Sequence, residues 1–175
     1  MAKPDINTVG GLLLARGYDG QISRVTETIV DSLVNSGTEV LLAAQCVGRD
    51  PAQPKCLRLA RVTDELLGLV VRDPWTYHAA EDGTVGFKQN RSVPFVRLGY
   101  VNATPAENVN AGDGVVAIFD NSSHVFTGLG STAGGLSAIR LLLKSHKWES
   151  DTAANASEPG EVSVLTGNSI NYVTY

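Results

Sequence analysis

The sequence predicts an all-β protein, built as a sandwich or barrel-like domain with at most one or two short helices. Glycine occurs 18 times in 175 residues, and only 18% of the residues are charged. Short apolar runs rich in valine and threonine alternate with turn signals at intervals of roughly 10–15 residues. β-Branched side chains suit the pleated surface of a sheet, and glycine suits the tight turns between strands.

A chain of this length most simply forms one domain. We expect residues 21–175 to form a single β-rich domain that ends in a short C-terminal tail. Glycines recur through the first 20 residues, where they would serve as hinges between extended segments. Residues 1–20 are therefore predicted to form an extended N-terminal arm.

Residues 22–34 fit two structures. Their apolar residues fall on one helical face, and Asn35-Ser36-Gly37 would end a helix there. The threonines and β-branched residues suit an edge strand equally well. The pattern alone leaves helix and strand open. Beyond this stretch, strands are expected at residues 40–47, 66–72, 92–101, 115–119 and 161–166.

The octet GLGSTAGG, Gly128 to Gly135, raises the question of a nucleotide pocket. Its first six residues, through Ala133, fit the pattern G-x-G-x-x-G/A that opens a dinucleotide-binding helix, and residues 136–143 are compatible with such a helix. However, the motif follows about 90 residues that have the pattern of strands, which does not suit a nucleotide-binding βαβ unit. We interpret the octet as a glycine-rich turn between strands, and expect neither NAD, ATP nor any other cofactor.

Charge and hydropathy limit the classes of partner that the chain could bind. The chain has 14 basic and 18 acidic residues, a net charge of −4, whereas a protein that neutralises phosphates is expected to be basic. No apolar run approaches the roughly 18 residues of a membrane span, and no signal peptide opens the sequence. We expect no nucleic acid and no membrane as partner, and synthesis in a cytosol.

No catalytic or metal-binding constellation is visible, so an enzyme is not expected. Ser131 lacks the G-x-S-x-G frame, because Leu129 stands where the first glycine belongs. Cys46 and Cys56 flank a short loop and could pair, although reduced thiols are favoured in a cytosol. The histidines lack metal-ligand spacing: His78, His124 and His146.

Aromatic residues in loops supply the remaining candidate site. Trp75 and Tyr77 follow the turn signal Asp73-Pro74, and Trp148 precedes another polar stretch. Such residues either fold back over the core or stay exposed as sugar platforms or interface anchors. A glycan-binding β-module that uses these aromatics is the alternative function.

The order of the segments resembles the structural cement, or capsid decoration, proteins of tailed phages, from about Gly20 to Leu165. Residues 67–73 look like the family's central G-V-V-x-R strand, and residues 93–101 look like its strand–Arg–Gly–aromatic hairpin, which leads to residues 109–115. Residues 147–153 and 160–165 look like its tryptophan strand and final strand. The resemblance favours a strand for residues 22–34.

The resemblance implies a non-enzymatic protein that binds the outside of the head and stabilises contacts between major capsid proteins. It implies a virion protein assembled in the host cytoplasm, and a homo-oligomer, either a trimer or a dimer. An extended arm suits that role, because a strand can add to an exposed sheet edge of the partner. The expected capsid contacts lie in the arm and in the aromatic loop: Lys3, Pro4, Asp5, Ile6, Trp75 and Tyr77.

Overall fold

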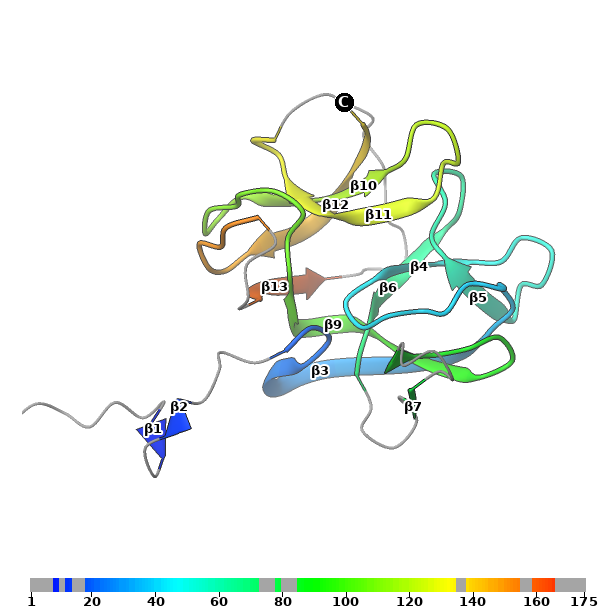
Figure 1. The fold of residues 1–175 in the computed structure, drawn as a ribbon, viewed down its shortest axis with the longest axis horizontal. Helices are drawn as coiled ribbons and strands as arrows, with labels where there is room; N and C mark the ends of the chain where they lie inside the picture. Colours follow the sequence, from blue (N-terminus) through cyan, green and yellow to red (C-terminus); the bar gives the residue numbers. More distant parts are fainter. Residues whose placement is uncertain are drawn as a thin grey trace, which may run out of the picture.

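The protein is all-β in its computed structural model, which describes residues 8–9, 12–13, 18–72, 78–79, 85–134, 138–154 and 159–165. The predicted fold class is therefore confirmed (Figure 1). The strands are β1 (Thr8–Val9), β2 (Leu12–Leu13), β3 (Ile22–Asn35), β4 (Cys46–Arg49), β5 (Cys56–Leu59), β6 (Leu66–Val70), β7 (His78–Ala79), β8 (Val85–Gly86), β9 (Ser92–Ala103), β10 (Gly114–Phe119), β11 (Phe126–Ser131), β12 (Ile139–Trp148) and β13 (Gly160–Leu165).

Five strands close into a ring in the order β9-β3-β5-β4-β6, because β6 pairs back onto β9. Residues 22–34, left open between helix and strand, belong to β3, which pairs antiparallel with β9. β3 also pairs with β5, in parallel, through Val34 and Asn35 only. The ring is thus a small barrel in which β3 and β9 are the two long strands.

The remaining strands of the large sheet extend it sideways from β9, in the order β13-β12-β10-β11. In Figure 1, β10, β11 and β12 lie together at the top of the ribbon, above the strands of the ring. β1 with β2, and β7 with β8, form separate two-stranded sheets. Among the residues that the structure describes, no helix is long and apolar enough to cross a membrane.

The wall of the barrel separates two apolar cores. Along β4, Cys46 belongs to the larger core and Val47 to the smaller one; along β6, Leu69 and Val70 divide in the same way. Successive residues of a strand face opposite sides of the sheet. Since the larger core also contains residues of β10 to β13, it lies outside the ring, and the smaller one fills the ring.

Closure of the ring depends on Gly68. Its φ is +157°, and a Cβ placed on it would collide with the carbonyl oxygen of Val96 in β9. The pairing of β4 with β6 shifts register beside Gly68, between Val47 and Gly48. A residue without Cβ is therefore required where β6 bends onto β9.

The expected strand at residues 40–47 is much shorter, because β4 starts at Cys46. Ala44 has a φ of +62°, a left-handed conformation that ends an extended segment. Its N–H donates to the carbonyl of Val70 at 2.8 Å, and Leu41 makes an isolated bridge to Phe87. Residues 41–45 thus form a loop fixed to the barrel, whose apolar side chains resemble those of a strand in sequence.

Candidate functional site

The N-terminal segment joins the body at residues 18–21. The N–H of Gln21 donates to the carbonyl of Tyr18 at 3.0 Å, which closes a turn with Gly20 at a φ of +74°. The Gly20 N–H donates to the carbonyl of Asn102 at 2.8 Å, and its carbonyl accepts from the Arg72 N–H at 2.9 Å. A Cβ on Gly20 would lie 2.7 Å from that of Ala43, so the backbone is seated directly on the barrel.

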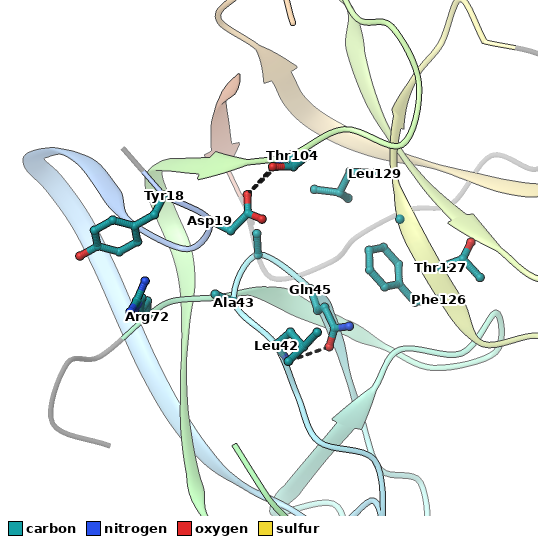
Figure 2. Close-up of a pocket in the computed structure, with 12 residues that line it drawn as sticks. Tyr18, Asp19, Leu42, Ala43, Gln45, Arg72, Thr104, Phe126, Thr127 and Leu129 are labelled. Carbon is teal, nitrogen blue, oxygen red and sulfur yellow. Dashed lines mark hydrogen bonds between the residues drawn. The ribbon is translucent and has the colours of Figure 1, made fainter. Parts of the chain in front are cut away.

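Two side chains reinforce this junction at residues 18–21, which we call the root. The Asp19 carboxylate accepts hydrogen bonds from the Thr104 N–H at 2.7 Å and from its hydroxyl at 2.9 Å. The Arg72 guanidinium lies 4.6 Å from the centre of the Tyr18 ring, a cation–π distance. Figure 2 shows Arg72 next to Tyr18, and Asp19 directed at Thr104. These contacts hold residues 18–21 on the folded domain.

A groove of about 580 Å³ opens beside the root. In Figure 2, Tyr18 and Arg72 lie at one end, and Phe126 and Leu129 of β11 lie at the other. The loop at residues 42–45 forms a further side. The lining mixes apolar side chains with polar ones, of which Asp19, Thr104 and Arg72 make the contacts described above.

A second feature is the edge of β3 that faces away from β9. In the described part of the chain, β5 is the strand that pairs with this edge, and it covers only Val34 and Asn35. Ile29, Val30 and Val34 on this strand are 51%, 41% and 40% exposed. They are three of the five large hydrophobic residues that are exposed among the described residues. Unpaired edges with apolar side chains are sites where another chain can add a strand.

Residues 22–34 were not among the capsid contacts expected from the sequence. The expected contacts in the arm and the aromatic loop lie outside the described residues: Lys3, Pro4, Asp5, Ile6, Trp75 and Tyr77. The run of β-branched residues at 22–34 was the available signal, but it could not show which edge of the strand would remain unpaired.

The glycine octet proves to be part of β11 and the turn that follows it. β11 includes Gly128 and Gly130 and ends at Ser131. The helix considered after the octet does not form in the described residues, since β12 runs from Ile139 to Trp148. The interpretation as a turn was thus correct only for the end of the octet, and a nucleotide-binding helix is absent from the described part of this segment.

The glycines leave space for a charged pair. Glu107 forms an ion pair with Arg140, whose side chain is only 7% exposed. Arg140 Nη1 donates to Glu107 Oε2 at 3.1 Å, and the Ser131 N–H donates to Glu107 Oε1 at 2.7 Å. A Cβ on Gly130 or Gly134 would collide with the Glu107 carboxylate. The octet therefore encloses the carboxylate of Glu107. A nucleotide-binding motif would hold a phosphate of its ligand in that position.

Of the two tryptophans in the glycan hypothesis, Trp148 is buried, and Trp75 lies outside the described residues. Trp148 is 0% exposed, and its Nε1 donates to the carbonyl of Gly130 at 2.9 Å. An aromatic platform for sugars must be accessible, so this candidate for a glycan site is wrong. The ring instead fills the larger core beneath β11.

Two titratable groups among the described residues, Cys46 and Asp120, have strongly shifted pKa values. Cys46 and Cys56 are both free, and burial raises the pKa of the Cys46 thiol to about 12. In the turn before β11, hydrogen bonds from Ser123 and Ser122 lower the pKa of Asp120 to about 2. Within the described ranges, no group of three or more histidine, cysteine or acidic residues could hold a metal ion.

Comparison with known families gives one match. The family model described as "Structural cement protein (E217 gp24/Pam3 gp6)" matches residues 6–165 of this chain. No curated protein matches the chain. The matched range includes all of the barrel, the extended sheet and the root of the N-terminal segment.

Proposed function

The chain belongs to the structural cement protein family of phages, and from this we propose that it is a capsid decoration protein that binds the outer surface of the head. It would act without catalysis, by bridging neighbouring major capsid proteins. The family match is the observation that carries the proposal. The acidic composition is compatible with a position outside the shell, away from the packaged DNA.

The N-terminal arm is the segment that we expect to bind the major capsid proteins. An arm that leaves the body at a fixed root loses less conformational freedom on binding than one attached by a loose linker. The bonds of Asp19 to Thr104 and of Gly20 to Asn102 provide such a root. Several copies on one shell would then hold it together even if each contact is weak, because multivalent attachment raises the effective concentration.

The test is co-sedimentation of the purified protein with expanded, undecorated shells of the phage, beside unexpanded precursor shells. We expect saturable binding to expanded shells only. Deletion of residues 1–17 should abolish that binding and leave the melting temperature of the body unchanged, because the root at residues 18–21 is retained. Absence of binding by the full chain would refute the proposal, and unchanged binding after the deletion would refute the role of the arm.

The variant Asp19→Ala gives a matched control for the arm. It keeps all of the arm residues and removes the two hydrogen bonds that hold the root to Thr104. Binding to expanded shells should weaken without being abolished, since the arm still reaches the shell but from a less fixed position. A loss as complete as that of the deletion would show that the body itself contacts the shell at this point.

A further inference from the structure

The hairpin formed by β1 and β2 is the starting point. Thr8 pairs with Leu13 and Val9 with Leu12, and Gly10-Gly11 connects the two strands. Each strand is only two residues long, and neither pairs with the nine-stranded sheet. An isolated two-stranded hairpin is at best marginally stable in water, so this hairpin would gain stability if it added to a third strand.

The body offers an edge of suitable length. The pairing of β3 with β9 is irregular from Ile22 to Val30, with register shifts on both sides of Arg24 and Ile29. The pairing with β9 becomes regular from Val30 onwards. On the other edge of β3, pairing with β5 begins at Val34. Among the residues that the structure describes, no strand pairs with the outer side of residues 30–33, and this regular stretch is long enough for either two-residue strand of the hairpin.

The side chains at this edge also need a partner. Ile29 and Val30 are both largely exposed, although they belong to one of the two longest strands of the molecule. Soluble proteins usually protect such edges with charged residues, bulges or a covering segment. The irregular part of β3 is protected by its bulges, whereas the stretch at residues 30–33 has none, and its one charged residue, Asp31, forms an ion pair with Arg97 of the neighbouring strand β9.

We propose that the hairpin β1–β2 of one copy adds to the β3 edge of a second copy, at residues 30–33. Within a single chain the hairpin does not pair with β3, and Figure 1 shows β1 and β2 apart from the strands of the barrel. A second copy carries an identical unpaired edge. Reciprocal exchange closes a dimer and cyclic exchange closes a trimer, so no hairpin and no edge is left unsatisfied.

This inference rests on the proposed function only for its purpose, which is to connect neighbouring copies on the shell. Its test uses the protein in solution, without shells. The 18.5 kDa chain should associate as its concentration rises, as measured by sedimentation equilibrium. Deletion of residues 1–17 removes the donor, and Val30→Lys places a charge on the acceptor edge, so each variant should remain a monomer.

Mixing the two variants is the decisive experiment. The deletion variant retains an intact edge, and Val30→Lys retains an intact hairpin, so an equimolar mixture should form a one-to-one heterodimer. Ala52→Lys is the matched control, because Ala52 is exposed in the turn between β4 and β5 and lies neither on β3 nor in the groove beside the root. It should associate like the unaltered chain. Circular dichroism melts verify that every variant is folded.

Three outcomes would overturn the exchange. A full-length chain that stays monomeric at all concentrations would mean that the hairpin folds onto its own chain or that the edge awaits a capsid strand. Self-association of the deletion variant would point to direct pairing of two β3 edges. A mixture that forms no heterodimer would exclude donation of the hairpin. Binding to expanded shells by a strictly monomeric protein would overturn the exchange alone and leave the decoration role intact.

Discussion

The outer edges of β11 and β3 present the same physical problem and receive different solutions. An unpaired edge exposes a row of backbone N–H and carbonyl groups. On β11 these groups are covered: Phe126 N–H donates to Ala60, and the Leu129 carbonyl accepts from Ala106, at 2.9 and 2.8 Å. On β3 the stretch at residues 30–33 has no paired strand on that side among the described residues.

This difference in edge pairing distinguishes an edge that is buried within the folded body from one that can bind a partner. The β11 edge ends at the Glu107–Arg140 pair, which the glycines of the octet enclose. That edge is part of the folded body, and we expect substitutions there to affect stability. The β3 edge carries exposed apolar residues, and we expect substitutions there to affect association instead.

The largest effect is expected from Glu107→Ala. This substitution leaves the guanidinium of Arg140, 7% exposed, without the carboxylate to which it donates. Removal of one partner from a fully buried ion pair costs about 3–5 kcal/mol of unfolding free energy, and we expect a loss towards the lower end because the Glu107 side chain is 22% exposed. Urea denaturation measures it. A loss below that of an ordinary surface substitution would show that the covered edge does not depend on the pair.

Gly130→Ala comes next. The new Cβ would collide with the Glu107 carboxylate, so we expect a loss of about 1–3 kcal/mol from overpacking. The double variant with Glu107→Ala should lose less than the sum of the two single losses, because the colliding group is gone. Additive losses in a double-mutant cycle would contradict this explanation of the octet.

A smaller, pH-dependent effect is expected at Asp120, in the turn that leads into β11. Its pKa is lowered from 3.8 to about 2 by hydrogen bonds from Ser123 and Ser122. A lowered pKa means that the ionised form stabilises the fold above pH 3.8, and that this stabilisation is lost as the pH falls towards 2. The difference in Tm between the unaltered chain and Asp120→Asn should therefore be present at neutral pH and vanish near pH 2. A constant difference across that range would show that the charge contributes nothing.

The smallest effect on stability is expected at the open edge. Val30→Lys should change the unfolding free energy by no more than about 0.5 kcal/mol, because the side chain is 41% exposed. Leu42→Lys serves as the control at similar exposure. A loss of several kcal/mol in urea denaturation for Val30→Lys alone would mean that the edge is already packed within one chain, and would remove the contrast between the two edges.

Local patterns were sufficient for the fold class and for most strands. The apolar runs at residues 66–72 and 115–119 predict β6 and β10, because strand propensity and the turn residues at strand ends act over a few residues. The loop at residues 41–45 shows the limit. Its apolar residues look like a strand, but Ala44 takes a left-handed conformation that the surrounding barrel holds in place.

The sequence by itself determined that the chain would be all-β, rich in turns and acidic. Only the tertiary structure decided that Glu107 would lie against Gly130, that β6 would close onto β9 at Gly68, and which edge of β3 would stay open. These contacts join residues far apart in the chain. They depend on which strands become neighbours, and the spacing of residues within one strand carries no information about that choice.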